Sequence, residues 1–229
     1  MDSLSLLTRT QHELQAFRAC LDGDLDAPVE HCDGWTLRDL AGHLGTGNLW
    51  AAAAVTEGHG DHRPRVPRDP AELAGWFEET CSVLLDALRA DPSAPAWTFH
   101  PPHTVGFWRR RRCLETLVHR WDAENALGTA RPLDTETAAE GVAEVFDTMA
   151  PRQLARGRAV PPGQAVRLVS ADTGASWVHG PGTPVATASA TAADLLLMLW
   201  GRVPGDDGRI VWEGDRAAGL RVLDGPLVP

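Results

Sequence analysis

The sequence of 229 residues is poor in positive charge. It contains 21 Lys and Arg residues against 31 Asp and Glu residues, which gives a formal net charge of −10. Proteins that bind nucleic acids carry a basic surface, so this balance argues against a nucleic-acid partner. The run Arg109 to Arg112 is the local exception. A helix spreads four consecutive residues around its axis, so we expect solvated, salt-bridged arginines here, with anion binding as the alternative.

Cysteine and long apolar runs are also scarce. The longest strongly apolar stretch, Ala192 to Trp200, is far shorter than the ~20 residues of a membrane helix. The N-terminus lacks a basic segment followed by a long apolar run. We therefore predict a cytoplasmic protein with no membrane partner. The four cysteines lie far apart without a CxxC pair, so we expect reduced thiols and no disulfide framework: Cys20, Cys32, Cys81 and Cys113.

The sequence also lacks the motifs of several enzyme classes. It has no G-x-S-x-G elbow, Walker A loop, dinucleotide-binding glycine pattern or H-E-x-x-H pair. These absences argue against the corresponding hydrolase, nucleotide-binding and zincin chemistries. The composition, with 43% hydrophobic and 23% charged residues, is nevertheless typical of a folded globular protein.

Helical periodicity dominates the first half of the chain. An apolar stripe runs from Leu4 to Leu21, and Thr36 with Asp39 has the form of a capping box ahead of a second helix. The expected helices span residues 4–21, 37–55, 71–90 and 105–127, and Gly128 closes the last of them. Because mostly short connections join these helices, the pattern predicts an antiparallel four-helix bundle.

The second half mixes helices with short strands. We expect helices over residues 135–153 and 191–200, strands within 160–185, and two further strands over 209–213 and 220–223. The fold class is therefore expected to be α+β. We predict two domains, a helical bundle over residues 1–145 and a small α+β domain over residues 146–229.

Glu115 and His119 are the residues with the most suggestive spacing. Four residues apart in a helix, they project from one face and suit two ligands of a divalent metal. A catalytic zinc site of this kind takes three protein ligands, and His43, on the second expected helix, is the best third candidate. On spacing alone, a surface Glu–His pair that stabilises its helix slightly is the alternative.

Three segments resemble a known family. Asp33–Leu44 (DGWTLRDLAGHL), Thr104–Trp108 (TVGFW) and Glu115–Glu124 (ETLVHRWDAE) are similar to the mycothiol-dependent maleylpyruvate isomerase family, and so is Asp194–Arg202 (DLLLMLWGR). The resemblance covers nearly the whole chain. It implies an N-terminal DinB-like metal-binding four-helix bundle followed by a small α+β C-terminal domain.

The resemblance also implies a site and a reaction. His43, Glu115 and His119 would hold zinc, or another divalent metal such as nickel, iron or manganese. The open metal position would take the thiolate of mycothiol, which adds to the cis double bond of maleylpyruvate, allows rotation and is then eliminated. Arg202 is the first candidate to bind the substrate carboxylates, ahead of Arg63 and Arg65. A helix-end role is the alternative for Arg202.

Three classes of function stay open at this point. The first is an isomerase or S-transferase that uses zinc and a low-molecular-weight thiol on a small electrophilic, carboxylate-bearing substrate such as maleylpyruvate. The second is a metal-dependent hydrolase that uses zinc-activated water. The third is a non-catalytic metal-binding or small-molecule-binding protein. The expected partners are a small-molecule substrate and a thiol cosubstrate, and the chain is expected to be a monomer or dimer.

Overall fold

The chain forms two compact units, Met1–Pro132 and Leu133–Pro229. The structure, a computed structural model, describes residues 3–67 and 69–229. The division falls earlier than the domain boundary expected after residue 145. The reason is that α5 (Thr135–Glu144) packs against α7 (Ala192–Leu199), so closely that a Cβ added to Gly141 would lie 2.8 Å from Leu196.

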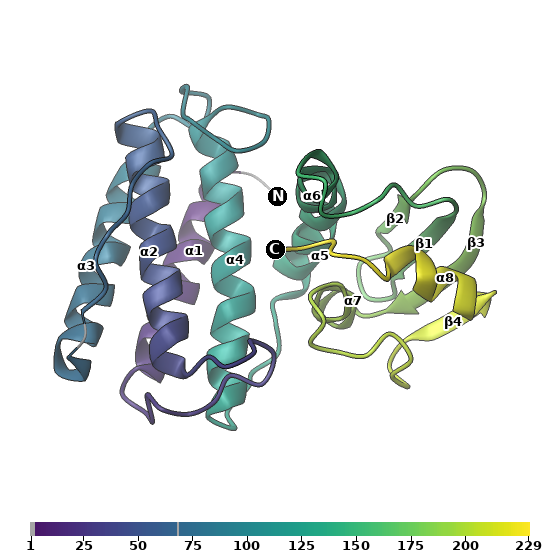
Figure 1. Ribbon diagram of the computed structural model, residues 1–229, viewed down its shortest axis with the longest axis horizontal. Helices are drawn as coiled ribbons and strands as arrows, with labels where there is room; N and C mark the ends of the chain where they lie inside the picture. Colours follow the sequence, from purple (N-terminus) through teal and green to yellow (C-terminus); the bar gives the residue numbers. More distant parts are fainter. Residues whose placement is uncertain (1–2, 68) are drawn as a thin grey trace. The chain divides into compact units, whose positions relative to one another are not determined.

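The first unit is the predicted four-helix bundle (Figure 1). Its helices α1 and α2 each pack against both α3 and α4, so the bundle closes around one core. Phe17, Leu44, Phe77 and Trp108 in this core are completely buried. The helices are α1 (Ser3–Cys20), α2 (Leu37–Thr56), α3 (Pro70–Leu88) and α4 (Val105–Ala126).

Local capping explains where α2 and α4 begin or end. The Thr36 hydroxyl accepts a hydrogen bond from the backbone N–H of Asp39, and the Asp39 carboxylate accepts one from the backbone N–H of Thr36 at 2.9 Å. The predicted capping box is therefore confirmed. After α4, Gly128 has a φ of +69°, a conformation that glycine adopts without steric cost, and its N–H donates to the carbonyl of Asn125.

The expectation of solvated arginines at Arg109 to Arg112 is wrong for three of the four residues. Arg109, Arg111 and Arg112 are only 6%, 4% and 1% exposed. Four consecutive arginines do not reveal which of them the neighbouring helices will enclose. Arg109 donates to two backbone carbonyls at the C-terminal end of α3, whereas Arg111 and Arg112 both pair with Glu115.

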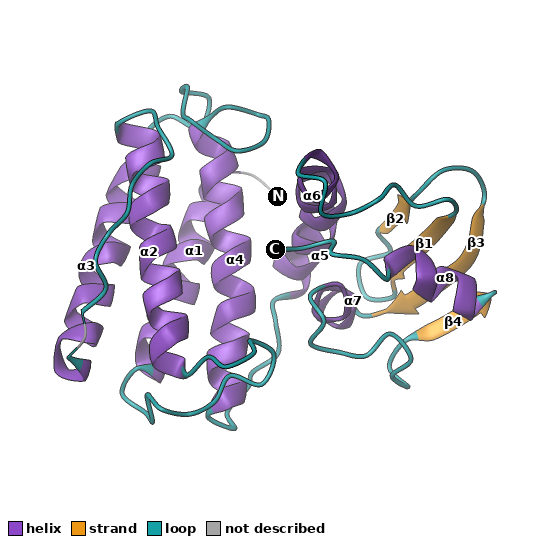
Figure 2. Cartoon of the chain, in the orientation of Figure 1, coloured by secondary structure: helices purple, strands orange, loops and turns teal. Residues whose placement is uncertain are grey.

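The second unit has the α+β composition expected from the sequence (Figure 2). A π-helical segment, Val145–Met149, follows α5 and leads into α6 (Ala150–Ala155). The sheet has the strand order β2-β1-β3-β4, in which β1 and β3 are parallel and both outer strands are antiparallel to their neighbours. The strands are β1 (Ala165–Ser170), β2 (Ser176–His179), β3 (Pro184–Ala190) and β4 (Val211–Gly214).

One face of this sheet is buried. The paired residues Val166 and Ala186, and the next pair on the same face, Leu168 and Ala188, are at most 3% exposed. Arg167, which lies between them in sequence, points to the opposite face and is exposed. This alternation is the period of two expected of a half-buried strand, and α7 and α8 (Arg216–Leu223) both contact β1 and β3.

The strand expected over residues 220–223 is wrong, because these residues belong to α8. Asp215 caps this helix by accepting a hydrogen bond from the N–H of Ala218 at 2.9 Å. A Cβ added to Gly219 would lie 2.5 Å from the Trp212 ring, so α8 packs directly on the sheet. A single apolar turn of helix and a short strand look alike in sequence.

Two further expectations concern cysteines and membranes. All four cysteines, which lie within the described ranges, are thiols. Cys113 is fully buried in α4, as expected of a core residue. Among residues 3–67 and 69–229, no helix combines the length and hydropathy that crossing a membrane would require.

Candidate metal centre

The structure brings His43, Glu115 and His119 together. One ligand atom from each residue lies within 4.8 Å of those from the other two, close enough to share one ion. His43 Nε2 is 3.3 Å from Glu115 Oε1, and the rings of His43 and His119 have centroids 5.2 Å apart. The residues singled out by spacing therefore form one cluster.

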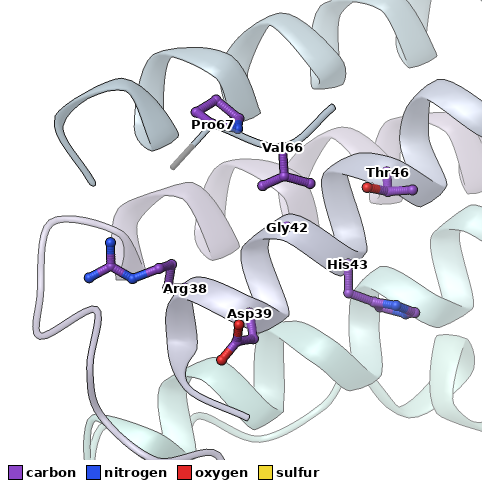
Figure 3. Close-up of a pocket in the computed structure, with 7 residues that line it drawn as sticks. All are labelled: Arg38, Asp39, Gly42, His43, Thr46, Val66 and Pro67. Carbon is purple, nitrogen blue, oxygen red and sulfur yellow. The ribbon is translucent and has the colours of Figure 1, made fainter. Parts of the chain in front are cut away.

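Two packed helices build this cluster. His43 lies in the first half of α2, and α2 packs directly against α4. Glu115 and His119 lie one helical turn apart on α4, so they share the face that meets α2. Figure 3 shows the His43 side chain projecting from α2 away from Val66 and Pro67.

Glu115 is an ionised carboxylate within the bundle. Burial alone would raise its pKa, but Arg112, Arg111 and His43 favour the charged form and hold the pKa well below its usual value. Both arginines contact the same oxygen, Oε2, at 2.8 Å from Arg112 and 3.2 Å from Arg111. The other oxygen, Oε1, lies on His43 Nε2 and contacts neither arginine in these pairs.

His119 is oriented by a buried acid. Its Nδ1 lies 3.0 Å from Oδ2 of Asp122, which directs Nε2 toward the cluster. Burial lowers the pKa of His119, and Asp122 opposes this effect only in part. The ring is therefore neutral at pH 7, as metal coordination requires. A carboxylate behind a ligating histidine is a common arrangement, because it fixes the tautomer and raises the basicity of the ligand.

The cluster is accessible on the His43 side. The His43 side chain is 42% exposed, against 16% for Glu115 and 7% for His119. A cavity of about 520 Å³ borders His43, between α2 and the segment that contains Val66 and Pro67 (Figure 3). The Trp35 ring lies 5.0 Å from the His43 ring. The exposed His43 side chain leaves the cluster open to solvent on one side, whereas the cavity is lined by His43 but by neither Glu115 nor His119.

Three residues that the sequence did not single out support these donors. Asp122 follows His119 by three residues, while Arg111 and Arg112 precede Glu115 by four and three residues. Each of these spacings places the pair on one helix face. The spacing could therefore have indicated these pairs. Whether such a pair is exposed or is buried beside a candidate ligand depends on the other helices of the bundle.

The predicted substrate-binding arginines belong to different units of the chain. Arg202 follows α7 in the second unit, donates to the carbonyl of Trp200 at 2.6 Å, and has its guanidinium 5.7 Å from the centroid of the Trp200 ring. Arg63 and Arg65 are exposed in the loop after α2. None of the three is among the donors of the cluster.

A helical bundle that carries a candidate metal centre of two histidines and a glutamate, followed by a small α+β unit, defines a class of two-unit proteins with a possible metal site in the first unit. The chain belongs to the mycothiol-dependent maleylpyruvate isomerase family, which is a family of enzymes. Residues 7–124 match the family model described as the mycothiol maleylpyruvate isomerase N-terminal domain. Residues 136–221 match the model of the C-terminal domain of the same family.

Individual proteins are also similar to this chain in sequence or in fold. Uncharacterized proteins from two strains of Mycobacterium tuberculosis are each 27% identical over 165 residues, which is 69% of this chain and 85% of theirs. A crystal structure of the mycothiol-dependent maleylpyruvate isomerase has a TM-score of 0.70 at 16% identity, and one of a mutant of that enzyme has 0.69 at 15%. Each covers 93% of both chains, so the fold is shared along almost the full length.

Proposed function

We propose that this protein is a zinc-dependent and mycothiol-dependent enzyme, an isomerase or S-transferase for a small electrophile that carries a carboxylate, such as maleylpyruvate. The observation that carries the proposal is the cluster of His43, Glu115 and His119, with donors within 4.8 Å and an exposed edge at His43. Three protein donors with one accessible side are typical of a catalytic rather than a structural zinc site.

The donor set fits a divalent ion. Two imidazoles and one carboxylate are ligands that zinc prefers, and the neutral His119 and ionised Glu115 already have the protonation states that coordination requires. When bound, such an ion would supply a Lewis acid that lowers the pKa of a coordinating thiol. The cavity of about 520 Å³ beside His43 lies within the size range of small-molecule sites.

Other side chains would hold the candidate ligands and the substrate in place. Arg111 and Arg112 hold the Glu115 carboxylate, and Asp122 holds the His119 ring. In our proposal Arg202 binds a carboxylate of the substrate, for which a planar guanidinium is well suited. The thiol adds to the cis double bond, the bond rotates as a single bond, and elimination returns the thiol together with the trans product. Atoms balance, so no further reactant is needed.

The test is turnover of maleylpyruvate by the zinc-loaded protein with and without mycothiol. The proposal expects the trans product only when mycothiol is present, and no activity in the His43→Ala variant. Transfer of mycothiol to a second electrophile, without isomerisation, would identify the S-transferase. Hydrolysis that proceeds at the same rate without the thiol would favour a metal-dependent hydrolase and contradict the proposal. Tight binding without turnover would instead indicate a binding protein.

A further inference from the structure

Arg112 is a deeply buried charged residue beside the candidate metal centre. Its side chain is 1% exposed and its guanidinium makes three hydrogen bonds to two helices. Nη1 donates to Oε2 of Glu115 at 2.8 Å, while Nη2 donates to the carbonyl of Leu44 at 3.1 Å and to Oδ1 of Asn48 at 2.7 Å. The guanidinium therefore ties the ligand on α4 to the backbone of α2.

The surrounding chain is shaped to admit this side chain. A Cβ added to Gly47 would lie 2.5 Å from Nη1 of Arg112, so only glycine leaves room for the guanidinium at this position. Asn48, which accepts from Arg112, donates through its own amide to the Thr80 hydroxyl on α3 at 3.2 Å. Three helices thus fix the position of one guanidinium.

Holding Arg112 here has an energetic cost. Burial lowers the pKa of Arg112, and its Nε has no hydrogen-bond partner within the described part of the chain. Buried polar atoms are usually satisfied, and buried ion pairs are often no more stabilising than apolar side chains of the same size. Stability alone is therefore a weak explanation for Arg112, and its contact with Glu115 suggests a different one.

We propose that Arg112 is a positioning residue that makes Glu115 a one-oxygen metal ligand. Arg112 engages Oε2, with Arg111 beside it, whereas Oε1 lies 3.3 Å from Nε2 of His43. A carboxylate that binds through one oxygen leaves a coordination position for the thiol, whereas one that binds through both oxygens would fill that position. This inference rests on the metal site of the proposed function.

The test compares two conservative variants of buried arginines on the same helix. Arg112→Lys keeps the positive charge but cannot reach Glu115, Leu44 and Asn48 together. Loss of an outer partner of a metal ligand typically weakens metal binding about 10–100-fold, and we expect this increase in the zinc Kd. Arg109→Lys is the matched control, because Arg109 is also buried but donates to carbonyls at the end of α3. It should lower thermal stability without changing the zinc Kd.

A third variant perturbs Arg112 without altering it. Gly47→Ala should displace the guanidinium and weaken zinc binding in the same direction. Zinc affinity is measured by competition with a chromophoric chelator, and the melting temperature of each metal-free variant is measured alongside. An unchanged Kd in Arg112→Lys, or equal losses in Arg112→Lys and Arg109→Lys, would overturn the proposal.

A structure of the native zinc-loaded protein decides the question even if the variants do not fold. One oxygen of Glu115 on the metal supports the proposal, and two oxygens overturn it. Failure of this inference is distinguishable from failure of the proposed function. If the native protein binds no zinc, the metal site itself is wrong, whereas normal zinc binding with two Glu115 oxygens refutes only the role of Arg112.

Discussion

Among single residues, Asp122 orients one of the candidate ligands, His119. The Asp122 side chain is fully buried behind His119, on the side of the ring away from the other donors. Asp122→Asn keeps the shape but removes the charge that holds the His119 tautomer. We expect zinc binding to weaken about 10–100-fold. The measurement is the zinc Kd by chelator competition, with the exposed Asp86→Asn on α3 as the control, which should bind zinc like the native chain.

Arg202 poses a different question, because two roles are compatible with its position after α7. A role in substrate binding predicts that Arg202→Met lowers kcat/KM about 10–100-fold, since a hydrogen bond to a charged group contributes about 1.5–3 kcal/mol. Zinc content should not change, and Arg202→Lys should recover part of the activity. If Arg202→Met lowers only the melting temperature and leaves kcat/KM intact, the residue serves the end of its helix through the carbonyl of Trp200.

At the scale of elements, the capping box of α2 makes a prediction that depends on pH. Hydrogen bonds from the backbone and hydroxyl of Thr36 lower the pKa of Asp39 from 3.8. Because the pKa of Asp39 is lower in the folded than in the unfolded chain, its carboxylate stabilises the folded protein above pH 3.8, and this stabilisation is lost as the pH falls further. Asp39→Ala should therefore lower the free energy of unfolding by about 0.3–1.5 kcal/mol at neutral pH.

Urea unfolding at neutral pH and at about pH 3 tests this expectation. The difference between the native chain and Asp39→Ala should shrink at the lower pH, which lies below the usual pKa of an aspartate carboxyl. Asp61→Ala, in the exposed loop after α2, is the control and should change stability little at either pH. A difference that is the same at both pH values would show that the charge of Asp39 does not stabilise α2.

The elements that could be predicted from the sequence are those with local signals. The Thr36 and Asp39 pair and the positive φ of Gly128 are properties of a few neighbouring residues, so they identify one end each of α2 and α4. The strand expected at residues 220–223 is wrong because apolar residues do not reveal whether they will pair with another strand or form a helix that packs on Trp212. Long-range packing decides between the two structures. It also decides that α5 belongs to the second unit.

At the scale of the whole molecule, the family resemblance and the two matched domains agree on one organisation. A helical bundle that contains the three candidate ligands precedes a small α+β unit. The three candidate ligands could be predicted because helix spacing and family motifs mark them. The burial of Arg112 could not, since it depends on Gly47, Asn48 and the packing of three helices. The sequence thus indicates the candidate ligands, whereas the side chains that contact them can be recognised only in the structure.

The most direct test of the candidate metal centre is the metal content of the purified protein, measured by elemental analysis after refolding with zinc. We predict about one equivalent of zinc in the native chain and a loss of it in His43→Ala and Glu115→Ala, because each variant removes one of three donors. Circular dichroism of the variants should still report a helical fold. Absence of zinc from the native protein, or its full retention in both variants, would contradict the central claim that these residues form a metal centre.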